Sequence, residues 1–221
     1  MSAMQIDHLF IRARVGAPEA AQLRALGLAE GSGNRHPGQG TENRRFFFNN
    51  AFLELLWIAD EEEVHSAQTS PTLLAERLAD GSPACPFGVC FRPSGNDNDS
   101  APFPSWQYAP SYLPPGMRID IGADVPASEP MWFHLPKGVV PASYAEARRQ
   151  PLQHPAGVTA ITSVTLTLPP QTLSAPAQAA CRGTGLTLRE GDAYLMEICF
   201  DHGAQGTTHD CRPNLPLLLH F

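Results

Sequence analysis

Residues 33–60 read GNRHPGQGTENRRFFFNNAFLELLWIAD, and this stretch predicts a loop followed by two paired strands. The loop covers residues 31–41, where four glycines and one proline break any regular element. Residues 43–48 and 51–58 are rich in aromatic and aliphatic side chains, as strands are. The two asparagines that separate these strands tolerate positive φ and therefore favour a tight turn.

The chain before this loop supplies a strand and a helix. Apolar and polar residues alternate over residues 4–14, which predicts a strand with His8 on one face and its neighbour Asp7 on the other. A short helix is expected over residues 18–26, and Gly27 suits the left-handed cap that ends a helix. The chain up to residue 60 therefore follows the order strand, helix, loop, strand, turn, strand, which is one βαβββ module.

The same order returns near the C-terminus. Residues 158–168 predict a strand rich in β-branched side chains, and residues 173–181 predict a helix. Residues 186–189 and 193–200 predict two further strands around a Gly191-Asp192 turn. We interpret this segment as a degenerate second copy of the module.

Three segments follow from this pattern, and we expect them to pack as one globular unit. Residues 1–60 form the first βαβββ module, and residues 61–156 form an intervening segment with a helix and further strands. Residues 157–221 form the second, degenerate module and the C-terminal tail. The pairing of the modules stays open, because strands expected between residues 87 and 135 could also join the cup.

Composition limits the classes of partner. The chain has 221 residues, of which 43% are hydrophobic, so it can bury a sizeable core. Lys and Arg number 15 against 22 Asp and Glu, a balance that disfavours a nucleic-acid partner. The first residues lack the pattern of a secretory signal, and no long apolar run predicts a membrane span. We expect a cytoplasmic protein, and the five cysteines, an odd number, suit free thiols there.

Three segments together resemble the glyoxalase-like domain branch of the vicinal-oxygen-chelate superfamily. They are IDHLFIRA at residues 6–13, the stretch quoted above, and LQHPAGVTAITSVTLTLP at residues 152–169. The most specific part is the ordered series of His36-Pro37, Gly40-Thr41, Asn43 and the strand FLEL. The resemblance implies an α+β fold in which repeated βαβββ modules form a cupped mixed sheet around a pocket, and it implies a possible homodimer.

The resemblance also points to a His/Glu pair. In metal-using relatives the first and last strands of a module each give one ligand, and His8 and Glu54 occupy the matching positions. A divalent Zn, Ni, Mn or Fe ion would suit these two donors. In the C-terminal copy the corresponding residues are Ser163 and Met196, so the ligand set is incomplete and metal binding stays open. Without a metal, His8 paired with Glu54 could be a general base or a structural histidine.

Other side chains are candidates for binding a substrate. The glycine-rich loop and the strand after it carry polar groups toward the pocket mouth, and one arginine there could clamp a carboxylate. An aromatic wall could come from the extended piece near residue 132, although such side chains are often ordinary core. The histidine of the LQHPAG motif could equally stabilise a turn. These candidates are His36, Thr41, Asn43, Arg45, Trp132, His134 and His154.

Two kinds of function are compatible with these residues. The first is a glyoxalase-like small-molecule enzyme of lyase, isomerase or dioxygenase type, with His8 and Glu54 in the cup. The alternative is a non-catalytic protein that binds or sequesters a small aromatic or antibiotic-like ligand. The degenerate C-terminal copy favours either the binding protein or a metal-free enzyme.

Overall fold

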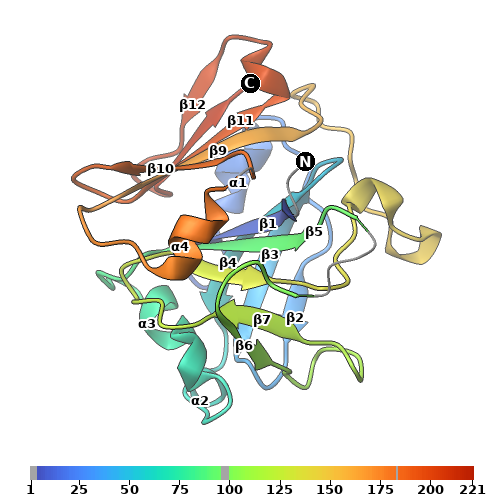
Figure 1. Ribbon diagram of the computed structural model, residues 1–221. Coiled ribbons are helices and arrows are strands. Elements are labelled where there is room, and N and C mark those ends of the chain that lie inside the picture. The colour runs from blue at the N-terminus through green and yellow to red at the C-terminus, as the bar shows by residue number, and fades with distance from the viewer. Residues whose placement is uncertain (1–3, 96–99, 183) are drawn as a thin grey trace.

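The structure is a computed structural model that describes residues 4–95, 100–182 and 184–221 (Figure 1). Its largest feature is an eight-stranded mixed sheet that curls into a cup. The α+β class and the cupped sheet predicted from the sequence are therefore confirmed. In spatial order the strands are β2 (Asn34–His36), β3 (Thr41–Phe47), β4 (Phe52–Ile58), β1 (Met4–Arg12), β5 (Phe87–Pro93), β8 (Met131–His134), β7 (Ile119–Gly122) and β6 (Ser105–Tyr108).

The cup consists of two four-stranded halves that meet at β1 and β5. In the first half β1 pairs with β4 in parallel, and β4 and β3 continue antiparallel toward the edge strand β2. The second half repeats this arrangement, because β5 pairs with β8 in parallel and β8, β7 and β6 follow antiparallel. The central segment, residues 87–134, is therefore the partner of the N-terminal module in the cup. The sequence alone had left this pairing open.

The C-terminal segment builds a separate five-stranded sheet. Its first strand, β9, pairs in parallel with β10 and antiparallel with β11. In the N-terminal module, by contrast, the first strand β1 pairs in parallel with the last strand β4. The prediction that this segment repeats the βαβββ module is therefore wrong, and Ser163 and Met196 do not take the places of His8 and Glu54. In spatial order its strands are β10 (Leu186–Glu190), β9 (Ile161–Leu168), β11 (Leu195–Phe200), β13 (Leu217–His220) and β12 (Thr208–Asp210).

The two sheets share one hydrophobic core. Leu9 and Leu53 of the cup and Val164 and Ile198 of the C-terminal sheet belong to the same buried cluster, so this sheet covers the outer face of the cup (Figure 1). Asn50 ties the sheets together, because its amide donates to the carbonyl of residue 161 at 2.7 Å and its oxygen accepts from the N–H of the same residue at 3.0 Å. The three segments thus pack as one body around this core.

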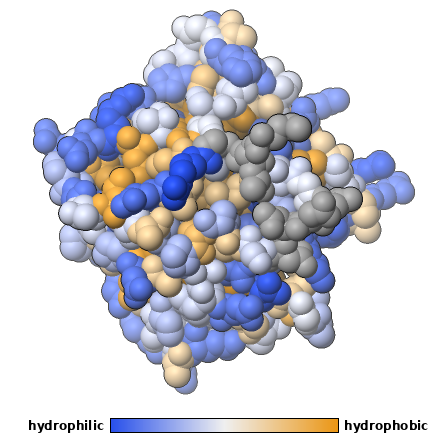
Figure 2. All heavy atoms as spheres, in the orientation of Figure 1, coloured by the Kyte–Doolittle hydropathy of each residue, from blue (hydrophilic) through white to orange (hydrophobic). Residues whose placement is uncertain are grey.

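Short helices close the remaining edges. Within the described residues every helix is too short or too polar to cross a lipid bilayer. Hydrophobic residues gather around the alanine-rich α4 on the face shown in Figure 2, where the two sheets meet. The α-helices are α1 (Ala20–Ala25), α2 (Glu61–Val64), α3 (Leu74–Leu78) and α4 (Ala175–Ala180), and 3₁₀ turns lie at Ser70–Thr72, Pro141–Ser143, Glu146–Arg148 and Asp201–Gly203.

Candidate functional site

The inner face of the cup encloses a cavity of about 190 Å³. Strands from both halves of the eight-stranded sheet form its walls, and Tyr112 and Leu113, in the connection between β6 and β7, form its roof. Most of the lining is apolar. The polar side chains that reach it include His8, Asn34, His36, Gln39, Arg45 and Glu54.

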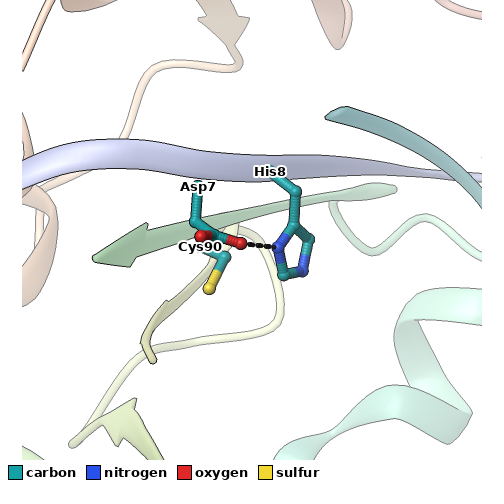
Figure 3. Close-up of side chains that lie close together, drawn as sticks. All are labelled: Asp7, His8 and Cys90. Carbon is teal, nitrogen blue, oxygen red and sulfur yellow. Dashed lines mark hydrogen bonds and ion pairs between the residues drawn. The ribbon is translucent and has the colours of Figure 1, made fainter. Parts of the chain in front are cut away.

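A β-bulge in β1 places Asp7 beside His8. In the ladder between β1 and β5, Ile6 pairs with Phe91 and His8 pairs with Cys90, so Asp7 is an extra residue on its strand. The regular alternation of a strand is interrupted there, and both side chains leave β1 on the same side (Figure 3). The prediction that Asp7 and His8 face opposite ways is therefore wrong. His8 Nδ1–H donates to Asp7 Oδ1 at 2.7 Å.

Arg92 holds the Asp7 carboxylate in place. Asp7 is 4% exposed and Arg92 is 3% exposed, so this pair is shielded from water. Arg92 Nη1 lies 3.5 Å from Asp7 Oδ2 and donates to the carbonyl of Ile6 at 2.7 Å, while Nη2 donates to the carbonyl of Asn50 at 2.9 Å. A buried carboxylate needs such a partner to stay ionised. The charge that orients His8 is thus itself fixed by the sheet.

His8 presents its second nitrogen to the cavity. Its ring stacks on Phe52, with the centroids 4.4 Å apart and the planes 15° from parallel, and it meets the edge of Phe133 at 5.3 Å. Since Nδ1 is used by Asp7, Nε2 is the nitrogen free to accept a proton. Glu54 Oε2 lies 3.9 Å from Nε2, so the His/Glu pair predicted from the sequence does come together.

Asn43 positions Glu54. Its side-chain amide donates to Glu54 Oε1 at 2.5 Å, and its oxygen accepts from the N–H of Asn34 at 2.7 Å. Asn43 is buried behind the cavity wall and does not line the cavity, in contrast to the role in substrate binding expected from the sequence. A hydrogen-bonded partner of this kind makes it tolerable to bury Glu54 among apolar neighbours.

Thr41 positions His36 in a similar way. Thr41 Oγ1 lies 2.8 Å from His36 Nδ1 and accepts from Gln39 Nε2 at 2.8 Å. Tyr112 covers this group, because its ring lies 4.7 Å from the His36 ring and its hydroxyl donates to Gln39 Oε1 at 3.2 Å. Burial lowers the pKa of His36 below its ordinary value, so the ring is neutral at pH 7. His36 and Gln39 line the cavity, whereas Thr41 acts through them.

Trp132 and His134 lie outside the cavity. On β8 the neighbours Met131 and Phe133 point into the cup, so alternation turns Trp132 and His134 to the opposite face. Trp132 Nε1 donates to Glu129 Oε2 at 3.2 Å, and His134 Nδ1 lies 3.3 Å from Asp120 Oδ2. The prediction that these two residues form an aromatic wall beside the pocket is therefore wrong, and Phe133 lies in the cavity wall instead.

His154 is a structural residue. Its Nδ1 accepts from the N–H of Ala29 at 2.9 Å, and its Nε2–H donates to the carbonyl of Phe47 at 2.9 Å. Both nitrogens are thus used to join the segment before β9 to the first module, and the side chain does not reach the cavity. Of the alternatives left by the sequence, a stabilising role fits these contacts and substrate binding does not.

The neutral state of His154 makes stability depend on pH. Burial lowers the pKa of His154, because the charged ring would lose the solvation that water gives it in the unfolded chain. The unfolded chain then binds a proton more readily than the folded chain, so the free energy of unfolding should fall as pH drops below about 6.5. Urea unfolding at about pH 7.5 and about pH 5.5 measures this slope, and His154→Asn should flatten it. An equally steep slope in the variant would contradict this assignment.

Donor atoms surround both nitrogens of His8, and they can be tested as ligands of a divalent metal. Asp7, His8 and Cys90 place three ligand atoms within 4.8 Å of one another (Figure 3). On the opposite side of the ring Glu54 is the neighbouring donor. These two groups are the candidates for the metal centre that the family resemblance implies.

Neither group fits a resident ion. Nδ1 and Asp7 Oδ1 share a proton at 2.7 Å, whereas two ligands bound to one ion at about 2.1 Å lie about 3 Å or more apart. Burial raises the pKa of Cys90 well above its ordinary value, so an ion bound at its sulfur would have to displace the thiol proton. On the Nε2 side His8 and Glu54 supply two donors, and catalytic zinc sites use three. Phe133 packs against His8 there and adds no donor.

Elemental analysis tests this conclusion directly. The purified wild-type protein should contain far less than one equivalent of any divalent transition metal. His8→Ala and Glu54→Ala should leave that content unchanged. One equivalent of a metal in the wild type, lost in either variant, would show that the donor groups rearrange around an ion.

Comparisons with known proteins agree with this fold. The model of the glyoxalase-like domain family matches residues 6–181. A structure of a hypothetical protein from Staphylococcus aureus is similar over 98% of this chain and 98% of its own, with a TM-score of 0.54 and 11% sequence identity, which supports the fold alone. None of the curated proteins matches. The family match covers most of the sequence, so the chain belongs to the glyoxalase-like domain family, within the vicinal-oxygen-chelate superfamily.

Proposed function

We propose that the cup is the active site of a lyase or isomerase that moves a proton on a small, oxygen-rich molecule, with His8 as the general base. The observation that carries this proposal is the position of His8: Nδ1 is held by a buried carboxylate at 2.7 Å, and Nε2 faces the cavity. A base oriented in this way accepts a proton from substrate without first having to reorient.

The chemistry proposed is removal of a proton from a carbon next to a carbonyl group. Nε2 takes the proton, and the electron pair of the C–H bond moves into the carbonyl, which becomes an enolate. Return of the proton to a neighbouring atom gives an isomer, and loss of a leaving group gives an elimination. Glu54, 3.9 Å from Nε2, is placed to relay the proton between these positions. The positive charge on His8 during the reaction is balanced by Asp7.

The side chains around His8 favour this reaction because they keep water away from the enolate intermediate. Phe52 and Phe133 pack against the His8 ring, and Tyr112 roofs the cavity beside His36. Excluding water strengthens the interactions of the charged groups inside the site. A dioxygenase would need a metal centre that the donor atoms around His8 do not provide, so we favour lyase or isomerase chemistry.

Solvent-deuterium exchange tests the proposal. Small 2-oxo acids, hydroxy ketones and aldehydes are incubated with the protein in heavy water, and proton NMR follows loss of the C–H signal next to the carbonyl. The wild-type protein should accelerate exchange in at least one class, and His8→Gln should not. Exchange at equal rates in both proteins would contradict the role of His8.

The second candidate function is binding without turnover. It is favoured by the apolar character of the cavity wall, where aromatic and aliphatic side chains from both halves of the sheet outnumber the polar groups. A wild-type protein that binds a ligand in the cavity but exchanges no proton of any compound in the panel would support this alternative.

A further inference from the structure

The cavity has two unlike ends. Asn34, His36 and Arg45 gather in the part formed by β2 and β3, whereas the part formed by the second half of the sheet and α3 is apolar. A ligand that satisfies both must combine a polar group with an apolar body. The apolar end is formed by Leu74, Ile119, Met131, Phe133 and Leu135, together with Phe10 of the neighbouring strand β1.

Arg45 is the cation of the polar end, and it has donor capacity to spare. Its Nε donates to the carbonyl of Ser32 at 2.8 Å, and Nη2 donates to Ser32 Oγ at 3.2 Å and to the carbonyl of Gly33 at 3.3 Å. Within the described parts of the chain no hydrogen bond uses Nη1, and no carboxylate lies within 4.0 Å of the guanidinium. A guanidinium keeps its charge in a protein, so this charge has no ion-pair partner there.

The neighbouring arginines show the contrast. Arg44, the next residue along β3, forms a two-pronged pair with Glu30 at 2.5 and 2.6 Å. Arg35 pairs with Glu42 at 2.6 Å. Both of these pairs lie outside the cavity lining, and Arg45, which lines the cavity, is the one left without a carboxylate.

Arg45 is also held in place before any ligand arrives. Its guanidinium carbon lies 5.0 Å from the centre of the Phe47 ring and 5.8 Å from that of Phe52, within the range of cation–π attraction. The carbonyls of Ser32 and Gly33 fix its orientation. A preorganised arginine loses little conformational entropy when it captures an anion.

Two carboxylates lie near the cavity, and one of them, Glu54, is opposite Arg45 across β3 and β4 and attracts its guanidinium without forming an ion pair within 4.0 Å. Asp7 is neutralised by Arg92, and Glu54 is bound by the amide of Asn43. An anionic group can therefore settle at Arg45 while the rest of the molecule extends over His8.

The volume sets the size of the ligand. An apolar cavity of about 150 Å³ takes up benzene. A cavity of about 190 Å³ therefore has room for one aromatic ring or a branched aliphatic group with a short polar substituent. Larger anions, such as nucleotides or coenzyme A esters, do not fit inside it.

We propose that the cavity selects small monocarboxylates with one aromatic or branched apolar body, with the carboxylate on Arg45 and the body against Phe133 and Leu135. This inference names the substrate class of the site and rests on the proposed function for the placement of the reacting carbon near His8. The carboxylate supplies the oxygen-rich end, and the carbon chain between the two ends is the part that passes Nε2.

Calorimetric titration with two matched probes tests the inference. 3-Phenylpropanoate carries the carboxylate, and 3-phenylpropanamide has the same shape without the charge. The wild-type protein should bind the carboxylate about 10-fold or more tightly than the amide, because hydrogen bonds to charged groups contribute about 1.5–3 kcal/mol. Arg45→Met should abolish this preference, and Arg44→Met, the matched control on the other face of β3, should keep it.

Equal binding of the two probes by the wild type would overturn the inference, and so would a preference that survives in Arg45→Met. Failure of the wild type to bind either probe at millimolar concentration would overturn it as well. The proposed function fails separately: if His8→Gln keeps the preference and also keeps proton exchange, the substrate class stands and the general base does not. Proton exchange that depends on His8 but shows no preference for carboxylates would support His8 as the general base and contradict the proposed substrate class.

Discussion

The His8→Gln variant should exchange protons about 10²- to 10⁴-fold more slowly than the wild type, which is the usual contribution of a general base. Glutamine has nearly the same bulk as histidine and fits between Phe52 and Phe133, but it cannot accept a proton at pH 7. The side chain of His8 is partly exposed, so the fold should tolerate this change. The rate is measured by proton NMR in heavy water, on the substrate class with the fastest wild-type exchange.

An exposed histidine provides the control. His65 lies at the end of α2, where its Nδ1 is 2.8 Å from the carbonyl of Glu61 and where it is remote from the cavity lining. His65→Gln should therefore exchange at the wild-type rate. If His8→Gln also exchanges at that rate while unfolding at the same temperature as the wild type, another group must be the base.

Replacing Arg77 by methionine should give the largest loss of stability, about 3–5 kcal/mol. Arg77, in α3, is 1% exposed and donates to the carbonyls of Pro126 at 3.1 Å, Ala127 at 3.2 Å and Glu129. Methionine fills part of the space but donates no hydrogen bond, and each lost bond from a charged donor costs about 1.5–3 kcal/mol. The buried carbonyl of Glu129 is then left without a donor, whereas those of Pro126 and Ala127 keep one backbone N–H each. The melting temperature should fall by roughly 10 °C.

Arg12 is the matched control for this variant. It also donates to three carbonyls, those of Arg77, Ala79 and Ser82, at 3.1 to 3.2 Å, but its side chain is only half-buried. Water can replace an arginine at a partly exposed site, so Arg12→Met should cost about 1 kcal/mol. Equal losses in the two variants would show that burial of the carbonyls is not what makes Arg77 important. Urea unfolding of both variants measures the difference.

The N-terminal half of the cup could be predicted because its signals are local. The glycine-rich loop, the asparagine turn and the apolar strands around them lie within 60 residues, and each has a clear composition. For the other half the sequence predicts strands between residues 87 and 135 but leaves their pairing open, because β6, β7 and β8 are four residues each, too short to show periodicity. The parallel pairing of β5 with β8 joins segments about 40 residues apart, and composition carries no signal for it.

The site was predictable in part for the same reason. His8 and Glu54 were found because each stands out on an apolar strand and the resemblance aligns them. Asp7 was missed because the bulge that turns it toward His8 exists only in the pairing of β1 with β5, and alternation alone predicts the opposite face. A homodimer and a cytoplasmic location remain predictions from the sequence.

The shared core between the two sheets has a consequence for how this protein can change over evolutionary time. Residues of the C-terminal sheet contribute to that core, yet none of them lines the cavity in the described part of the chain. Substitutions in β9–β13 can therefore raise or lower stability without altering what the cup recognises. A chain that ended before β9 would keep the polar residues of the site but expose Leu9, Leu53 and their neighbours to water. The C-terminal segment thus gives the cup freedom to accumulate substitutions for new ligands, since the stability that they cost can be restored far from the chemistry.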